Sequence, residues 1–342
     1  MNELTQSLLK AISRYDMNLK GEYKRVRKLE QLSHPYVKRV TSNRMDRIVH
    51  LEDHDILVRA FSRDGKIAPV LLFFHGGGFV TGDFDSYSNV CATLAAQTGY
   101  KVVSVNYRLA PEHKFPAGVE DCYAVTQQIL THCEEWYQVS ADQVILIGDS
   151  AGATLSCVTS FLCRDRGGLM PGGQILIYPA AWCDYTDATP FASVAENGAD
   201  YILTRKKLLD YMELYASEPE NRLDPRFAPL RNTDFSGLPP TLLLTMEFDP
   251  LRDEGEELGR RLIAADNPVS AFRILNGVHG AFRLPVRQPV TAAMVLVTNM
   301  PNRSRDAGML PVPRMTASQM PSPLMHRYWR TRKEPMLCPS RI

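Results

Sequence analysis

A serine in the middle of the chain lies in a pattern that is typical of nucleophilic catalysis. Ser150 is the central residue of the segment Gly148–Gly152, which reads GDSAG and matches G-x-S-x-G. The apolar run Val144–Ile147 precedes it and a helix-like stretch follows it, so the pattern predicts a tight turn between a strand and a helix. Such a turn lifts the hydroxyl above the sheet, where larger side chains in place of the two glycines would collide. The predicted chemistry is attack of the serine oxygen on an acyl carbon.

A second glycine-rich segment could stabilise the charge that this attack creates. The segment 73–79 reads FFHGGGF and follows an apolar run. Acyl transfer needs N–H donors for an oxyanion, and we assign them to Gly77, Gly78 and the amide of Ala151. His75 is expected to orient this loop. A phosphate-binding loop would need a following Lys-Ser/Thr or the spacing G-x-G-x-x-G, which are both absent here; a plain glycine turn is the simpler structural alternative.

A serine hydroxyl is a poor nucleophile unless a neighbouring imidazole takes its proton. Of the eight histidines, His279 is the favoured base because it follows the apolar run Phe272–Leu275 and an Asn-Gly pair. This position predicts a loop at the end of a late strand, where a sheet presents catalytic groups. An ordinary loop histidine would fit the same position, so the prediction depends on the order of the residues along the chain.

The base in turn needs a carboxylate that fixes its tautomer. Asp249 follows the apolar run Thr241–Met246 and is therefore predicted at a strand end. Asp253 is the competitor, but it is better placed as the cap of the helix that begins next to it. The order Ser150, Asp249, His279 is the one that the G-x-S-x-G hydrolases use.

A metal site is the rival reading of a cluster near the N-terminus, formed by His50, Asp53, His54 and Asp55. Strand alternation would place the two histidines on one face and the two aspartates on the other. This arrangement favours a solvated hairpin over a set of metal ligands. No metal site is therefore expected.

The elements that must position these residues follow from the hydrophobic pattern. Five short, almost wholly apolar runs predict strands that are covered on both faces: Val70–Phe74, Val102–Val105, Val144–Ile147, Ile175–Tyr178 and Thr241–Met246. Helix-like stretches lie between several of them, at 87–98, 116–133, 151–165 and 253–265. The alternation predicts an α/β fold, with a mostly parallel central sheet flanked by helices.

The same pattern suggests how the chain is divided. We expect an N-terminal helical part at 1–45 and a tail at 301–342. Between them lies a core in two parts, 46–182 and 236–300. The insertion 183–235 separates the two parts and is expected to fold over the sheet as a helical cap. A helix is expected at Arg205–Ala216 within the insertion. The tail has eight basic and two acidic residues and seven prolines, which predicts a solvated, disordered segment.

The bulk properties of the chain disfavour several classes of protein. Its 342 residues carry a net charge of +1, which gives no electrostatic reason to expect nucleic acid or a membrane surface as a partner. Seven cysteines without a CxxC pair argue against a zinc ribbon or a disulfide framework. No apolar run reaches the ~20 residues of a membrane helix and no secretory signal is evident, so a cytoplasmic location is expected.

Taken together, the motifs resemble those of the bacterial hormone-sensitive-lipase-like esterases, a branch of the α/β-hydrolases. The resemblance runs from about Arg47 to Phe282 and depends on five segments in order: His75–Phe79 (HGGGF), Tyr107–Glu112 (YRLAPE), Gly148–Gly152 (GDSAG), Asp249–Gly255 (DPLRDEG) and His279–Gly280. It implies the α/β-hydrolase fold with a two-part helical cap, and hydrolysis of carboxylic esters with mostly short or medium acyl chains.

The resemblance also implies roles for single residues. Asp249 is the triad carboxylate, and the YRLAPE segment braces the oxyanion loop, with Glu112 and Asp149 as supporting residues. The implied partner is a small-molecule ester, and the reaction needs no metal and no organic cofactor. One departure concerns His279, because the family packs a helix on the core soon after its histidine, whereas this chain passes into the tail.

Two other functions stay open from the sequence alone. A non-catalytic small-molecule-binding protein could use the same scaffold, but such proteins commonly lose a triad residue, and this chain keeps all three candidates. An acyltransferase would use the same acyl-enzyme with an alcohol in place of water. A homodimer is also left open.

Overall fold

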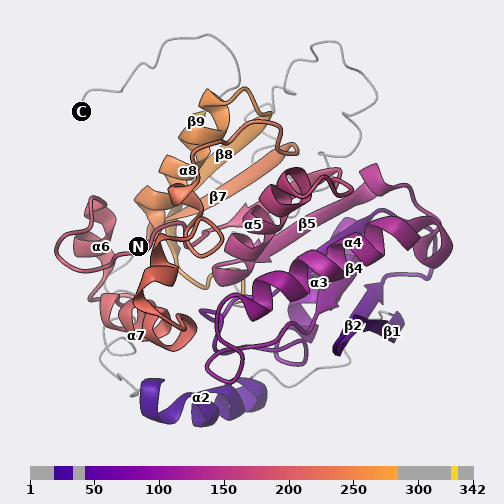
Figure 1. Ribbon diagram of the computed structural model, residues 1–342, viewed down its shortest axis with the longest axis horizontal. Coiled ribbons are helices and arrows are strands. Elements are labelled where there is room, and N and C mark those ends of the chain that lie inside the picture. The colour runs from indigo at the N-terminus through magenta and orange to yellow at the C-terminus, as the bar shows by residue number, and fades with distance from the viewer. Residues whose placement is uncertain (1–18, 34–42, 284–324, 330–342) are drawn as a thin grey trace.

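The computed structural model describes residues 19–33, 43–283 and 325–329, and in these residues one sheet organises the fold (Figure 1). Its strands are β1 (Asn43–His50), β2 (Asp55–Ser62), β3 (Val70–Phe74), β4 (Lys101–Val105), β5 (Val144–Asp149), β6 (Gly173–Ile177), β7 (Thr241–Phe248), β8 (Val269–Val278) and β9 (Met325–Trp329). The strand order is β1-β2-β4-β3-β5-β6-β7-β8-β9. Strands β4, β3, β5, β6, β7 and β8 pair in parallel, while β1, β2 and β9 pair antiparallel. The predicted mostly parallel α/β sheet is confirmed.

The apolar strands are buried because helices cover both faces of the sheet. In β3 all five residues are buried. Leu72 and Phe74 pack into a cluster with α4 (Ala117–Tyr137) and α5 (Ala151–Asp165). Leu71 and Phe73 point the other way, into a cluster with α3 (Ser88–Thr98). Because successive side chains of a strand alternate between faces, a strand covered twice has to be apolar throughout.

The register of the parallel strands brings the predicted chemistry to one edge. Phe74 at the end of β3 is paired with Gly148 in β5, and Asp149 is paired with Ile177 at the end of β6. The loop after β3, the turn after β5 and the chain leaving β6 therefore start side by side. The loops after β7 and β8 begin at the same edge, since these strands continue the parallel part of the sheet.

The segment between β6 and β7 is mostly helical. It contains α6 (Ala192–Asn197), α7 (Arg205–Tyr215) and two short 3₁₀ helices, η2 (Pro219–Leu223) and η3 (Pro229–Arg231). The N-terminal helix α2 (Leu19–Ser33) packs against α7, as Figure 1 shows. Lys20 of α2 forms ion pairs with Asp210 and Glu213 of α7. The helix predicted at Arg205–Ala216 is thus confirmed to within one residue.

Two expectations need correction in this part of the chain. Strand β1 begins at Asn43, so the N-terminal part predicted as helical to residue 45 ends earlier. Within the tail predicted to be disordered, Met325–Trp329 forms strand β9 beside β8. A strand was not expected because the tail has no alternating pattern. The rest of the tail, and residues 1–18 and 34–42, lie outside the described residues.

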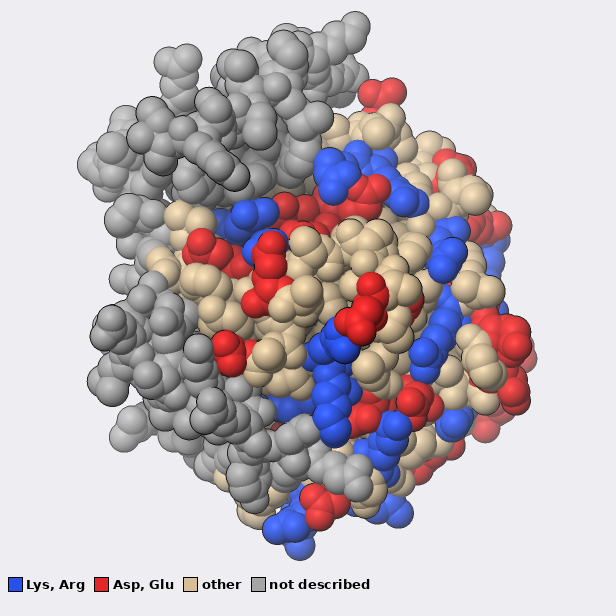
Figure 2. All heavy atoms as spheres, turned by 90° about the vertical axis from the view of Figure 1, so that its left-hand side faces the viewer, with Lys and Arg blue, Asp and Glu red and all other residues tan. Residues whose placement is uncertain are grey.

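The surface of the described chain is mixed in charge. Figure 2 shows basic and acidic side chains interspersed among uncharged ones on one face of the molecule. Among the described helices, none combines the length and the apolar character that a bilayer crossing requires. Helix α8 (Arg252–Ala264), which follows β7, completes the helical layer that α4 and α5 begin.

Candidate functional site

The turn that carries Ser150 is strained, and steric reasons require a glycine two residues before Ser150 and another two residues after it. The φ and ψ angles of Ser150 are 55° and −123°, a region that residues with a side chain rarely adopt. A Cβ atom on Gly148 would lie 2.2 Å from the carbonyl carbon of Gly152, and one on Gly152 would lie 1.9 Å from the oxygen of Phe74. The Ser150 N–H donates to the carbonyl of Ile177 at 2.9 Å. The turn is therefore fixed to the strands on both sides.

The three residues predicted to act together meet at the carboxyl edge of the sheet. His279 Nε2 lies 2.9 Å from Ser150 Oγ, and His279 Nδ1 lies 2.8 Å from Asp249 Oδ2. Asp249 is fully buried, and its Oδ1 also accepts the N–H of Leu251 at 2.9 Å. The Tyr178 ring packs against the imidazole, with the ring centroids 4.6 Å apart. This arrangement can hold the imidazole with one nitrogen toward the carboxylate and the other toward the hydroxyl.

The competing carboxylate, Asp253, faces the insertion and not the imidazole. Its Oδ2 accepts the N–H of Ser193 at 2.8 Å, and Ser193 Oγ donates to the carbonyl of Pro250 at 2.7 Å. Asn197 Nδ2 donates to the carbonyl of Asp249 at 3.3 Å. Asp253 also lies inside α8, whose N-cap is Leu251, so its predicted role as the helix cap was wrong. Helix α6 thus holds the loop of Asp249, a role that its short sequence does not signal.

Asp149 connects the nucleophile turn to the glycine-rich loop. Its Oδ1 accepts the N–H of Gly76 at 3.0 Å, and its Oδ2 accepts the hydroxyls of Tyr87 at 3.1 Å and Tyr178 at 3.3 Å. Burial raises the pKa of this carboxyl, while the hydrogen bonds and Arg283 oppose the rise. The predicted supporting role of Asp149 corresponds to these contacts.

In the glycine-rich loop after β3, the two glycines that follow Gly76 have backbone angles and surroundings that leave no room for a side chain. Gly77 and Gly78 have φ angles of 115° and 61°. A Cβ atom would lie 2.1 Å from the Thr81 oxygen at Gly77 and 2.3 Å from the Tyr211 ring at Gly78. Within the described chain, no group accepts the N–H of Gly77, Gly78 or Ala151. These three donors can therefore serve a ligand at Ser150.

His75 is a buried, structural part of this loop. Its ring stacks on Tyr107 with the centroids 4.4 Å apart, and its Nδ1 lies 2.8 Å from the carbonyl of Gly76. Burial lowers the pKa of His75 to about 4, so the ring is neutral near pH 7. Tyr107 donates its hydroxyl to the carbonyl of His75 at 2.7 Å. The contacts fit the expectation that His75 orients the loop.

Glu112 reaches the loop through a residue that sequence reasoning missed. Arg27 of α2 donates to the carbonyls of Val80 and Ala110, each at 2.7 Å. Glu112 holds the same guanidinium, with Oε2 at 2.9 Å and Oε1 at 3.1 Å. Glu112 is thus a brace for Arg27 and not for the loop itself. An arginine on an amphipathic helix reads as a solvated charge, so no local signal marks it.

Glu30, one helical turn after Arg27, joins the glycine-rich loop to the histidine loop. Its Oε2 accepts the N–H of Gly82 at 3.0 Å, and its Oε1 accepts Arg283 Nη1 at 3.3 Å. Arg283 follows His279 closely, and its guanidinium lies over the Tyr87 ring, 4.6 Å from the centroid. Helix α2 therefore supplies an anchor for the segment after His279.

The cluster near the first hairpin is largely solvated, as predicted, because His50, Asp53 and Asp55 are exposed and only His54 is mostly covered. Residues 51–54 form the turn between β1 and β2, so the alternation does not extend to them. His54 Nε2 lies 3.0 Å from Oδ1 of Asp121, which is fully buried, and its Nδ1 lies 2.6 Å from Asp53. His50 remains exposed and lies 2.7 Å from Asp55.

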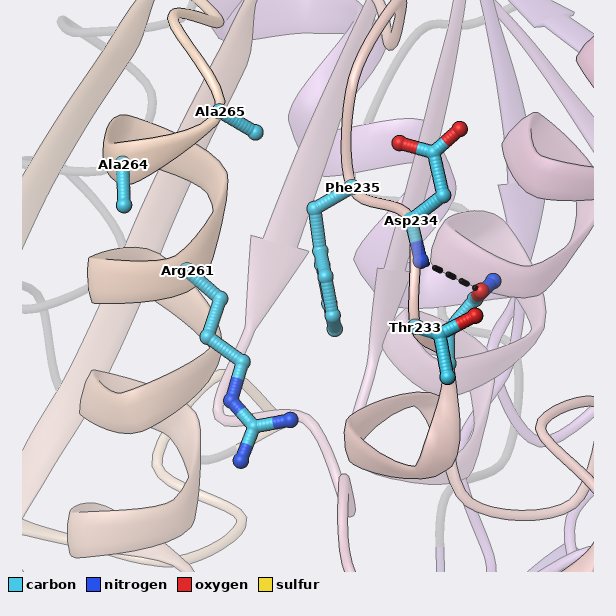
Figure 3. A pocket seen from close by; sticks show the side chains of 7 residues that line it. Thr233, Asp234, Phe235, Arg261, Ala264 and Ala265 are labelled. Atoms are coloured by element: carbon cyan, nitrogen blue, oxygen red, sulfur yellow. Dashed lines mark hydrogen bonds between the residues drawn. The ribbon is translucent and has the colours of Figure 1, made fainter.

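An open pocket of about 540 Å³ lies at the opposite edge of the sheet (Figure 3). It is lined by residues that precede β7 and by the end of α8: Asn232, Thr233, Asp234, Phe235, Arg261, Ala264 and Ala265. Arg261 Nη1 donates to the carbonyl of Leu230 at 2.7 Å, and Nε donates to Glu257 at 2.9 Å. None of the predicted site residues lines this pocket.

Comparisons with known proteins identify the family of this chain. Residues 71–283 match a family model described as the α/β-hydrolase fold. Esterase LipI of Mycobacterium tuberculosis is 40% identical over 220 residues, 64% of this chain and 67% of LipI. The ethyl acetate hydrolase of Pseudomonas putida is 35% identical over 216 residues, 63% of this chain and 66% of that protein.

A solved structure extends the similarity to the whole fold. The hyperthermophilic esterase of Pyrobaculum calidifontis has a TM-score of 0.79 and 31% identity, and the match covers 88% of this chain and 98% of that one. The family model spans more than half of the present chain. The chain therefore belongs to the α/β-hydrolase family, in its hormone-sensitive-lipase-like esterase branch.

Proposed function

We propose that this carboxylic ester hydrolase works as a serine esterase with an acyl-enzyme intermediate. His279 takes the proton of Ser150 while the oxygen attacks the ester carbonyl. The imidazolium then gives this proton to the leaving alcohol, and the acyl group stays on Ser150. In the second half, His279 takes a proton from water, the water oxygen attacks the acyl carbon, and Ser150 regains its proton as the acid leaves.

The charge that develops on the carbonyl oxygen is taken up by backbone donors. We assign this role to the N–H groups of Gly77, Gly78 and Ala151. The strained turn at Ser150 and the close contacts of both loop glycines support the assignment, because they fix the donors before the substrate binds. Ala151 adds the positive end of the α5 dipole.

One observation carries the proposal: the hydroxyl, the imidazole and the carboxylate are aligned at 2.9 Å and 2.8 Å. A non-catalytic small-molecule-binding protein would not need this alignment. An acyltransferase would share it, and differs only in the acceptor of the acyl group.

The substrate class is proposed from the surroundings of the site. Helix α2 and the insertion 183–235 form a cap over the carboxyl edge, and the cap would limit the acyl chain to short or medium length. The relative named ethyl acetate hydrolase supports a small ester. The partner is thus a small-molecule ester.

A panel of nitrophenyl esters from acetate to hexadecanoate tests this substrate class. We expect kcat/KM to be highest among the short and medium chains and to fall for the longest ones, because the proposed cap would leave no room for them. Release of the acid with added alcohol present would support hydrolysis. An ester of the alcohol as the main product would favour the acyltransferase, and no turnover of any ester would reject both.

A fall of activity at acid pH is the second expectation. Protonated His279 has no lone pair for the proton of Ser150, so turnover requires the neutral imidazole. The measurement is kcat/KM for a short nitrophenyl ester from neutral to acid pH, with circular dichroism at each pH to show that the protein is folded. A profile without an acid limb, in a protein that stays folded, would contradict a histidine base.

A further inference from the structure

A buried acid next to the triad has no part in the reaction described above. Glu254 lies in the first turn of α8 and is fully buried. Its Oε1 accepts three hydrogen bonds, from the N–H of Ala181 at 2.7 Å, the N–H of Trp182 at 3.3 Å and the hydroxyl of Tyr185 at 2.9 Å. So many donors on one oxygen show that this side chain fixes the segment 181–185.

The segment that Glu254 holds is the beginning of the insertion, directly after β6. Tyr178, three residues before Ala181, packs against the His279 ring and donates its hydroxyl to Asp149. Glu254 itself follows Asp249 closely, at the start of the helix that ends the Asp249 loop. One side chain therefore joins the neighbour of the imidazole to the loop of its carboxylate.

We propose that Glu254 is a positioning residue, which fixes the start of the insertion so that Tyr178 and Asp249 keep their places around His279. The proposal depends on the serine-esterase mechanism. Glu254 does not touch the substrate or the reacting atoms, and it acts through its three donors. Loss of the side chain should therefore lower kcat more than it changes KM.

The surroundings of Glu254 favour its neutral form. Among the described residues, the titratable groups that act on it are Asp249 from the loop after β7 and Tyr185 from the insertion. Burial and the charge of Asp249 raise the pKa of Glu254 to about 8, and the three hydrogen bonds oppose this rise. Its Oε2 has no hydrogen-bond partner among the described residues, and an ionised oxygen left without a partner costs more than a protonated one. Near pH 7 the acid is thus mostly uncharged.

This protonation predicts how stability depends on pH. The pKa of Glu254 is higher in the folded protein than its ordinary value of 4.5, so the neutral acid contributes its full stability below about pH 4.5. The contribution is lost as the pH rises toward 8, since the unfolded chain then releases a proton that the folded chain keeps. Glutamine keeps the acceptor oxygen but cannot ionise, so Glu254→Gln removes this loss.

The test compares Glu254→Gln, Glu254→Ala and a control, Glu257→Gln, which alters a partly exposed acid of the same helix that pairs with Arg261. Melting temperatures are measured between about pH 5 and 9, and kcat and KM for a short nitrophenyl ester at pH 7. We expect the melting temperature of Glu254→Gln, relative to wild type, to rise by several degrees from pH 5 to pH 8 and then level off. Its kcat should stay within about threefold of wild type, whereas Glu254→Ala should lose about tenfold or more in kcat.

Three outcomes would overturn the proposal. They are a melting difference for Glu254→Gln that does not change with pH, a Glu254→Ala variant with wild-type kcat, and a Glu257→Gln control that reproduces the pH trend. If Glu254→Ala does not fold, the glutamine variant and its pH series decide. A wild-type protein that turns over no ester would instead reject the proposed function, which is a different result from an active wild type with indifferent variants.

Discussion

Replacement of Ser150 by alanine is expected to lower kcat/KM for a short nitrophenyl ester by about 10⁴-fold to 10⁶-fold. The acyl-enzyme needs the oxygen that lies 2.9 Å from His279 Nε2, and alanine has none. Residual turnover would come from water activated by His279 beside the backbone donors, which are untouched by the change. The measurement is steady-state hydrolysis, together with mass spectrometry of the protein after a phosphonate inhibitor, which should label wild type at Ser150 and leave the variant unlabelled.

Ser160→Ala is the matched control for this experiment. Ser160 lies on helix α5, which begins directly after Ser150; it is fully buried and donates its hydroxyl to the carbonyl of Ser156 at 3.1 Å. It should keep kcat/KM within a few-fold of wild type and still react with the phosphonate. A Ser150→Ala variant that retains most of its activity would show that another residue is the nucleophile.

Asp249→Asn is expected to have the second largest effect, a loss of about 10⁴-fold in kcat. The carboxylate accepts from His279 Nδ1 and so keeps the lone pair of Nε2 directed at Ser150. An asparagine can place an N–H donor there, which favours the opposite tautomer. The carboxylate also stabilises the imidazolium that forms during the attack, and a neutral amide does not. The measurement is kcat for the same ester, with the melting temperature as a check on the fold.

Asp253→Asn separates this prediction from a general effect of acids near the site. Asp253 accepts the N–H of Ser193 and pairs with Arg252, and an asparagine oxygen can still accept the first of these bonds. We expect its kcat to change by less than about tenfold, because it has no contact with the imidazole. If the two variants behaved the other way round, Asp253 would be the functional carboxylate.

The sheet could be predicted because the apolar composition of its strands indicates that they are buried on both faces. Strands β3, β5 and β7 are continuous apolar runs, which only a strand covered on both faces needs. The helix-like stretches predicted between these strands were confirmed to within a few residues. Strand β9 was missed, since the Pro-rich and Arg-rich sequence around it has no period-two pattern.

The site could be predicted where each residue follows the end of a strand. Ser150, Asp249 and His279 follow β5, β7 and β8, and parallel strands end at one edge. The supporting contacts could not be found in this way. Arg27 looks like a solvated charge on a helix, and Glu254 looks like an ordinary acid in a first helical turn. Their burial depends on segments far away in the sequence.

Several expectations from the sequence stay predictions. They are the cap formed by the N-terminal part and the insertion 183–235, the cytoplasmic location, and a homodimer. The catalytic roles of Ser150, Asp249, His279 and the oxyanion donors also await the variants described above. The proposed acyl-chain preference would depend on side chains of the predicted cap, whose arrangement follows from tertiary packing and not from a local pattern.

Helix α2 has a consequence for how the active protein is assembled during synthesis. Its residues Arg27 and Glu30 precede their partners along the chain, since these include Ala110, Glu112 and Arg283. The early strands and helices can begin to associate before residue 283 emerges, but the bridge from Gly82 through Glu30 to the histidine loop cannot close until then. The support that α2 gives to the histidine loop is thus completed only after His279 itself has been synthesised.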